Sequence, residues 1–352
     1  MNHSEDKQSK LPTTTEKRKN EHIEVCLQED VQGVGITNGF ERYRFIHNAL
    51  PEIDFEDIQT ATTFLSKTMP VPFLISSMTG GTQLAWEINQ RIAQAAEERG
   101  WAMGLGSMRA ALENPEAEFS FKIRKYAPSI PVFANIGAVQ FNYGYGVEQC
   151  LRAVDMIEAD TLVLHLNSMQ EVFQPEGDKN FKQLLNKMEK VIHSLPIPVG
   201  VKEVGWGISA DSAKRLKEIG VQYIDVAGAG GTSWSQVEKY RTKDALYREM
   251  AETFAGWGNP TAECVKEIKQ QQAELLCIAS GGINNGLEAA KAIALGAHMV
   301  GYGRSLLQSS VDSVEQLAER LTKIELELKI AMFGVGAADL SELKGTKHLK
   351  SI

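Results

Sequence analysis

Short apolar runs recur along the chain, and each is followed by a stretch in which apolar positions have helical spacing. Eight such runs are present, at 72–78, 101–107, 131–137, 161–167, 198–204, 222–227, 275–281 and 297–303. Several are apolar throughout rather than alternating, which is typical of parallel strands buried on both faces. The pattern therefore predicts eight parallel strands, each leading into a helix.

The helical period is clearest at residues 85–99, 209–219 and 314–332, and Ser209 is a candidate cap for the second of these helices. A strand followed by a helix, eight times over, predicts an α/β fold of the (β/α)₈, or TIM-barrel, type. A doubly wound open sheet is the competing architecture. It is disfavoured because no G-x-G-x-x-G follows the first strand.

The chain of 352 residues fits one such barrel of about 250 residues with insertions. Residues 1–17 are polar, so we expect them to form a short disordered tail. Residues 18–352 are then expected to form a single domain. The longest connection, at 228–258, follows the sixth strand and is expected to act as a lid or a subunit contact.

Composition narrows the class of protein. Hydrophobic residues make up 43% and charged residues 23%, as in ordinary globular proteins, and the formal net charge of −8 argues against a general nucleic-acid binder. The first ten residues lack the apolar core of a signal peptide, and no apolar run is long enough to span a bilayer. Four cysteines are scattered without a CxxC pair, which fits a reducing compartment. We therefore expect a cytoplasmic enzyme with no membrane or nucleic-acid partner.

Glycine and polar residues gather directly after the predicted strands. In chain order these ends read SSMTGG (76–81), GSMR (106–109), NIGAVQ (135–140), HLNSMQE (165–171), KEVGWG (202–207), GAGGTSW (228–234), SGGINNG (280–286) and GYGR (301–304). Barrel enzymes form their active sites at the C-terminal ends of the strands, and glycines let backbone N–H groups approach a ligand closely. The sequence therefore predicts a ligand site at this end of the barrel.

The last two of these motifs follow the seventh and eighth strands, where barrels often bind phosphate through backbone amides and a short helix N-terminus. Gly281, Gly282, Gly303 and Arg304 are the candidates for this role. The alternative is that the glycines only form tight turns. The occurrence of both motifs at the two expected strands favours phosphate binding.

Lys202 ends the fifth strand and could be a Schiff-base nucleophile, a salt-bridge partner or a cation near a flavin ring. The sequence leaves these alternatives open. Glu203 follows directly and should point to the opposite side of the strand, so it is not the obvious partner of Lys202.

The motif HLNSMQE places His165 and Asn167 on one face of the fourth strand, with Gln170 and Glu171 in the loop that follows. Glu171 is either a solvated surface residue or a metal ligand, since Mg²⁺ commonly takes one or two protein carboxylates with phosphate oxygens and water.

The sequence RKNEH at 18–22 is either a charged entry to the domain or an anion clamp over the barrel mouth.

Taken together and in this order, the motifs resemble the type 2 isopentenyl-diphosphate isomerases from residue 18 to about residue 333. The resemblance is carried by RKNEH, SSMTGG, GSMRAAL, ANIGAVQ, HLNSMQE, VKEVGWG, AGAGGTSW, FAGWGNPT, SGGINNG and ALGAHMVGYGR. RKNEH and HLNSMQE discriminate this family, whereas SGGI…G with ALGA is shared more widely among FMN barrels. GYGR differs at a position where the family is not uniform.

The resemblance implies a homo-oligomeric barrel, tetramer or octamer, that converts isopentenyl diphosphate reversibly to dimethylallyl diphosphate with reduced FMN and Mg²⁺, and NADPH as a plausible reductant. It implies FMN contacts at Ser77, Met78, Thr79, Ser107, Asn135, Lys202 and Thr232, with the FMN phosphate on Gly281, Gly282, Gly303 and Arg304. It implies substrate contacts at Arg18, Lys19, His22, Ser107, Arg109, His165, Asn167 and Gln170, and Mg²⁺ on Glu171. The chain offers no obvious pair of carboxylates for acid–base work, so reduced FMN is expected to do it, with His165 and Gln170 in support.

Two other functions compete with this interpretation. An FMN-dependent 2-hydroxy-acid oxidase or dehydrogenase would need a base and an arginine, typically in an HGGR-like stretch, but the sequence there reads GAGGTSW without a histidine. In a flavin-binding barrel without catalytic activity, the polar motif HLNSMQE would have no function. The sequence does not indicate which flavin atom carries the proton.

Overall fold

Eight parallel strands close into a barrel in the computed structural model, which describes residues 14–352 and the side chains from Glu16 onward. The barrel strands are β4 (Phe73–Ile75), β5 (Ala102–Gly104), β6 (Val132–Gly137), β7 (Thr161–His165), β8 (Val199–Lys202), β9 (Tyr223–Asp225), β10 (Leu276–Ser280) and β11 (Met299–Tyr302). Each strand lies within one of the eight predicted runs, and β11 pairs with β4 to close the barrel. The predicted (β/α)₈ fold is confirmed.

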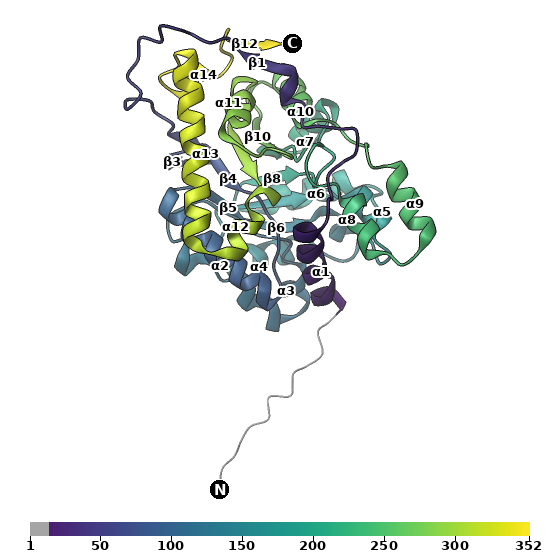
Figure 1. Cartoon of the computed structure of the whole chain (residues 1–352). Coiled ribbons are helices and arrows are strands. Elements are labelled where there is room, and N and C mark those ends of the chain that lie inside the picture. Colours follow the sequence, from purple (N-terminus) through teal and green to yellow (C-terminus); the bar gives the residue numbers. More distant parts are fainter. Residues whose placement is uncertain (1–13) are drawn as a thin grey trace.

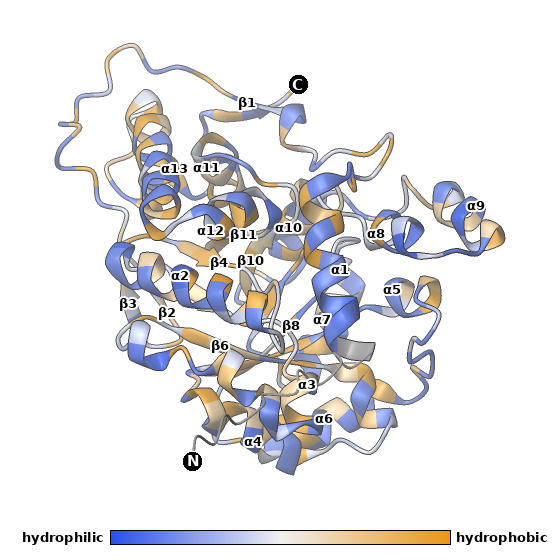
Figure 2. Cartoon of the chain, turned by 60° about the horizontal axis from the view of Figure 1, so that its bottom comes forward, coloured by the Kyte–Doolittle hydropathy of each residue, from blue (hydrophilic) through white to orange (hydrophobic). Residues whose placement is uncertain are grey.

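Helices surround the barrel (Figure 1). They are α2 (Gln83–Arg99), α3 (Arg109–Glu113), α4 (Val147–Ile157), α5 (Ser168–Phe173), α6 (Leu184–Ser194), α7 (Ala210–Glu218), α8 (Trp234–Arg241), α9 (Ala245–Thr253), α10 (Thr261–Gln271), α11 (Gly286–Ala294), α12 (Leu307–Asp312), α13 (Val314–Val335) and α14 (Leu340–Leu343). Most of them carry both polar and apolar residues (Figure 2), and in α2 the positions Ala85, Ile88, Ile92 and Ala96 are buried. Ser209 caps α7 as predicted, because its side chain accepts a hydrogen bond from the N–H of Ser212.

The end of the barrel at which the strands begin is plugged by a hairpin. Strands β2 (Thr62–Phe64) and β3 (Lys67–Met69) pair antiparallel, and Phe64 stacks on Phe133 with ring centroids 5.9 Å apart. Tyr223 packs edge-on against both rings. This aromatic cluster occupies that end of the barrel interior, so a ligand site is left to the opposite end, where the strands finish.

Two segments outside the barrel complete the domain. Helix α1 (Thr14–Gln28) packs against α8 beside the C-terminal ends of the strands (Figure 1), and β1 (Tyr43–Phe45) pairs with β12 (Leu349–Ser351). The connection at 228–258 folds largely as α8 and α9. No helix in the described part of the chain is long and apolar enough to cross a membrane.

The predicted boundary between tail and domain falls inside α1. Residues 14–17 belong to this helix, and residues 1–13 lie outside the described part of the chain. The helix is polar along most of its length, so hydropathy alone gave no signal for its start. Tertiary packing stabilises it instead, through buried residues such as Ile23, which is 5% exposed.

Candidate active site

A cavity of about 530 Å³ opens where the barrel strands end. Every residue for which the sequence predicted a binding role lines it. These residues are Arg18, Lys19, His22, Ser77, Met78, Thr79, Ser107, Arg109, Asn135, His165, Asn167, Gln170, Glu171, Lys202, Thr232, Gly281, Gly282, Gly303 and Arg304. Residues scattered over nearly 300 positions meet here because closing the barrel brings all strand ends together.

Glycines form the wall of the cavity beyond β9 and β10, where two loops pack backbone against backbone. Gly281 and Gly282 have φ values of 105° and 71°, and a Cβ on Gly281 would lie 2.1 Å from the carbonyl oxygen of Gly228. A Cβ on Gly303, by contrast, would meet nothing within 4 Å. The first two glycines are therefore required by turn geometry and close packing, whereas Gly303 leaves open space toward the cavity.

Arg304 lines the same end of the cavity and also binds α1. Its Nε donates to the carbonyl oxygen of Cys26 at 3.2 Å, and its Nη2 donates to that of Glu29 at 3.5 Å. The C-terminal end of a helix favours a cation because its last carbonyl groups lack partners. Arg304 therefore links the glycine end of the cavity to the end of α1.

His165 is neutral and oriented by Asn135. The Nδ2 atom of Asn135 donates to the carbonyl oxygen of Leu105 at 3.1 Å, so its Oδ1 accepts a hydrogen bond from Nδ1 of His165 at 2.8 Å. Burial, with the nearby cations Lys202 and Lys19, lowers the pKa of His165 to about 3. The imidazole is therefore neutral at pH 7, with Nε2 available as an acceptor.

Lys202 is buried on β8 and donates to the backbone carbonyl oxygen of Glu203. Burial lowers its pKa, while Asp225 on the neighbouring strand raises it. The carboxylate of Glu203 turns away, as predicted, and accepts from the three N–H groups that follow it in the chain. The amine of Lys202 is thus held at the end of β8 without a hydrogen bond to the adjacent carboxylate.

The cavity fits a flavin mononucleotide. Ser76 Oγ and Asn167 Oδ1 are buried without a hydrogen-bond partner in the described structure, and both residues line the cavity. Buried polar atoms are normally paired, so these two indicate a polar ligand. Open glycine backbone at one end suits a phosphate, and buried Lys202 suits an electron-rich ring system.

Cations surround the mouth of the cavity. Lys19 Nζ donates to the carbonyl oxygen of Ser107 at 3.2 Å and lies 5.5 Å from the ring centroid of Phe121. Burial, and then the charge of Arg18, lower the pKa of Lys19 to about 7. Arg18 pairs with Glu176 through Nη1 and Oε1 at 3.4 Å. Basic side chains at this part of the cavity suit an anionic group.

Glu171 is a buried carboxylate at the edge of the same cavity, 8% exposed. Its Oε1 accepts from Asn167 Nδ2 at 2.7 Å, and its Oε2 accepts from the backbone N–H of Asp178 at 2.6 Å. Burial raises its pKa. Residues 14–352 contain no group of three or more side chains that could hold a metal ion by themselves. A metal at Glu171 would take its other ligands from a substrate and from water, as Mg²⁺ commonly does.

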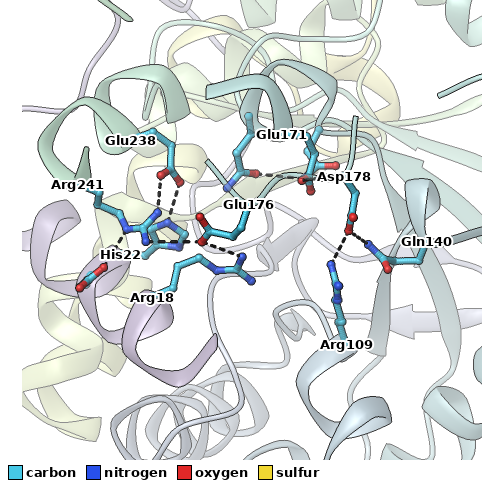
Figure 3. A network of polar contacts seen from close by, with 12 residues as sticks. Arg18, His22, Arg109, Gln140, Glu171, Glu176, Asp178, Glu238 and Arg241 are labelled. Carbon is cyan, nitrogen blue, oxygen red and sulfur yellow. Dashed lines mark hydrogen bonds and ion pairs between the residues drawn. The ribbon is translucent and has the colours of Figure 1, made fainter. Parts of the chain in front are cut away.

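An ionic network that the sequence did not reveal holds α1 in place (Figure 3). Nε2 of His22 lies 2.9 Å from Oε1 of Glu238 on α8, and Glu238 also pairs with Arg241. Arg241 Nε bonds Glu21 at 3.1 Å, and the ring of His22 packs edge-on against Trp234. Trp234 is the last residue of the motif GAGGTSW, but no spacing in the sequence indicated that the residues after it would meet α1.

Comparison with known proteins shows the family and the fold of the chain. A family model described as FMN-dependent dehydrogenase matches residues 15–122 and 147–350. Among solved structures, a flavocytochrome b2 variant superposes with a TM-score of 0.68 at 17% identity, covering 94% of this chain and 82% of that chain. A chimeric (S)-mandelate dehydrogenase variant gives 0.66 at 16% identity, covering 96% and 99%. The chain therefore has the fold of these barrels, and the family model, which matches most of its length, places it in the FMN-dependent dehydrogenase class.

Relatives with a higher sequence identity to this chain identify the family within this class. The isopentenyl-diphosphate delta-isomerase of Oceanobacillus iheyensis is 53% identical over 332 residues, which cover 94% of this chain and 95% of the relative. The protein of the same name from a Nostoc species is 49% identical over 346 residues, covering 97% and 99%. The chain belongs to the type 2 isopentenyl-diphosphate delta-isomerases, the family that its motifs resemble.

Proposed function

We propose that this protein interconverts isopentenyl diphosphate and dimethylallyl diphosphate. The observation that carries the proposal is that one cavity combines three parts: open glycine backbone, a buried lysine and neutral histidine, and a cationic mouth beside a single buried carboxylate. The names of relatives about 50% identical over nearly the whole chain support the same reaction.

The diphosphate is the part of the substrate that binds the mouth. Arg18, Lys19 and Arg109 supply cations there, and Glu171 would hold a Mg²⁺ ion that also takes diphosphate oxygens. Binding energy from this remote group can hold the alkene in place deeper in the cavity. Helix α1 covers the mouth and would exclude water, which would otherwise trap a carbocation.

The reaction needs one proton added to the terminal methylene and another removed from a neighbouring carbon, with charge of tertiary-carbocation character between the two steps. Reduced FMN, when bound, would supply this acid–base chemistry. His165 cannot donate a proton readily at pH 7, because its pKa is about 3, but its Nε2 can accept a hydrogen bond. His165 and Gln170 therefore orient groups around the reacting carbons in this proposal.

We expect NADPH to reduce the flavin without being consumed in each turnover. We also expect a cytoplasmic homo-oligomer, tetramer or octamer, in which the 228–258 segment is a lid or a subunit contact. Limited proteolysis with and without ligand would distinguish these two roles of the segment.

An anaerobic NMR assay in D₂O tests the reaction directly. Purified protein would receive FMN, excess NADPH, Mg²⁺ and isopentenyl diphosphate. We expect dimethylallyl diphosphate with incorporated deuterium and no stoichiometric use of NADPH. Absence of product from protein that holds reduced FMN would overturn the proposal, and oxidation of 2-hydroxy acids would be assayed next.

A further inference from the structure

The loop at 174–180 joins the two sides of the cavity mouth through one side chain, Asp178. Its Oδ2 accepts from Arg109 Nη1 at 2.6 Å and from Gln140 Nε2 at 2.9 Å (Figure 3). Its backbone N–H donates to Oε2 of Glu171 at 2.6 Å. One residue thus contacts an arginine of the proposed diphosphate site, a glutamine of the cavity wall and the proposed metal carboxylate.

Each of these contacts comes from a different element. Arg109 begins α3 after β5, Gln140 lies in the 3₁₀ turn after β6, and Glu171 lies in α5 after β7. Among the described residues, no direct hydrogen bond joins these three side chains to one another. Asp178 joins them instead. One oxygen of its carboxylate accepts from Arg109 and Gln140, and its backbone N–H donates to Glu171.

The neighbouring glycine shows how closely this loop is seated on Glu171. A Cβ added to Gly177 would lie 1.9 Å from the carbonyl oxygen of Glu171, which no side chain could tolerate. The loop therefore approaches Glu171 as closely as backbone permits, and Asp178 anchors it from the other side. Partners behind a metal ligand commonly change metal affinity by 10- to 100-fold when they are removed.

We propose that Asp178 is a positioning residue that couples the metal carboxylate Glu171 to the diphosphate-binding Arg109. This inference rests on the proposed function, which supplies the metal and the diphosphate. Asp178 sets the distance between the two groups before substrate arrives, so Mg²⁺ and diphosphate bind with mutual support. Loss of its carboxylate frees Arg109 and lets the 174–180 loop move away from Glu171.

If Asp178 acts merely as a negative charge, removing it should change the affinity for diphosphate in the opposite direction. An anion near Arg109 competes with diphosphate for the guanidinium, so its removal would then strengthen diphosphate binding. The positioning role predicts weaker binding of both diphosphate and metal. The direction of the change therefore separates the two roles.

Isothermal titration of the FMN-loaded protein with inorganic diphosphate, at a series of Mg²⁺ concentrations, tests the inference without turnover. In Asp178→Ala we expect the Mg²⁺ concentration for half-maximal diphosphate binding to rise about 10-fold or more. Asp178→Asn keeps an accepting oxygen and should recover part of this loss. Gly177→Ala keeps the Asp178 side chain but displaces the loop, so it should raise the Mg²⁺ requirement as well.

Glu113→Gln is the matched control, because Glu113 also pairs with Arg109, at 2.7 Å through Nε, but contacts the arginine from the exposed side of α3. Its Mg²⁺ requirement should stay within about twofold of wild type. In the isomerase assay, Asp178→Ala should raise KM and the Mg²⁺ requirement more than it lowers kcat. FMN content and melting temperature, measured in parallel, should match the wild type.

Three results would overturn the inference, one of them together with the proposed function. Tighter diphosphate binding in Asp178→Ala, or a Mg²⁺ requirement equal to that of Glu113→Gln, would show that Asp178 does not position the site. A wild-type protein that fails to bind diphosphate at any Mg²⁺ concentration would overturn the proposed function together with the inference. Normal wild-type binding with an unchanged Asp178→Ala variant would overturn the inference alone.

Discussion

Nε2 of His22 lies 2.9 Å from Oε1 of Glu238, a carboxylate that is only 1% exposed, although 216 positions separate the two residues. This contact joins α1 to α8 and thereby holds the helix that carries Arg18 and Lys19 over the cavity. Burial lowers the pKa of His22, which outweighs the opposite effect of Glu238. The pair therefore acts chiefly as a buried hydrogen bond to a charged acceptor.

Replacing this charged acceptor with a neutral one should loosen α1. In Glu238→Gln we expect backbone amides of residues 14–28 to exchange hydrogen about 10-fold faster or more, since a hydrogen bond to a charged group contributes about 1.5–3 kcal/mol. Hydrogen exchange followed by mass spectrometry measures this. Glu21→Gln is the control, because Glu21 pairs with the same Arg241 but is 37% exposed and should matter less. Equal protection of α1 in Glu238→Gln and wild type would refute its anchoring role.

Substrate affinity should depend on pH through Lys19. Its pKa of about 7 in the free protein means that the ammonium is present below pH 7 and is lost as the pH rises. Diphosphate binds the charged form, so binding above pH 7 requires proton uptake, and kcat/KM should fall by up to about tenfold per pH unit. Profiles from pH 6 to 9 measure this fall.

Lys19→Arg is the matched variant for the pH profile, because a guanidinium stays charged across this range. Ionisation of the substrate is common to both proteins and cancels in the comparison. The fall that Lys19 causes should therefore be absent from the variant. Identical profiles for the two proteins would show that Lys19 does not titrate in the free enzyme.

If Arg18 and Lys19 clamp the diphosphate at the mouth of the cavity, removal of Arg18 should weaken substrate binding by a definite amount. Arg18→Ala should lose about 1.5–3 kcal/mol of substrate binding, which raises KM about 10- to 150-fold. Steady-state kinetics measures the change. Glu176→Gln removes the exposed partner of Arg18 without removing its charge, so KM should change by less than about threefold. An unchanged KM in Arg18→Ala would count against the clamp.

Two glycines of the cavity should respond differently to the same methyl group. Gly281→Ala forces a residue at φ 105° against the carbonyl of Gly228, so the FMN-free protein should lose about 2 kcal/mol or more of unfolding free energy. The methyl group of Gly303→Ala meets open space, so this variant should lose at least about 1 kcal/mol less unfolding free energy than Gly281→Ala. It should nevertheless bind FMN more weakly. Urea unfolding and fluorescence titration with FMN measure the two effects. Normal FMN affinity in Gly303→Ala would argue against a phosphate at this position.

The sequence determined the barrel and most of the cavity lining. Parallel strands covered on both faces must be apolar throughout, so all eight could be read from continuous runs such as 161–167 and 275–281. Barrel closure then places every strand end on one face, so motifs that follow the strands had to meet. Residues as distant as Ser77 and Gly303 line one cavity for this reason.

Only the tertiary structure decided how the cavity is covered and which charges are paired. Helix α1 starts before its predicted boundary because its stability comes from packing on α8, which a polar sequence does not reveal. Glu238 and Asp178 lie in loops and helices without a distinctive motif, and their partners are distant in sequence. The pKa values of Lys19 and His165 follow from burial in the closed cavity, a property of the folded chain and not of residue type.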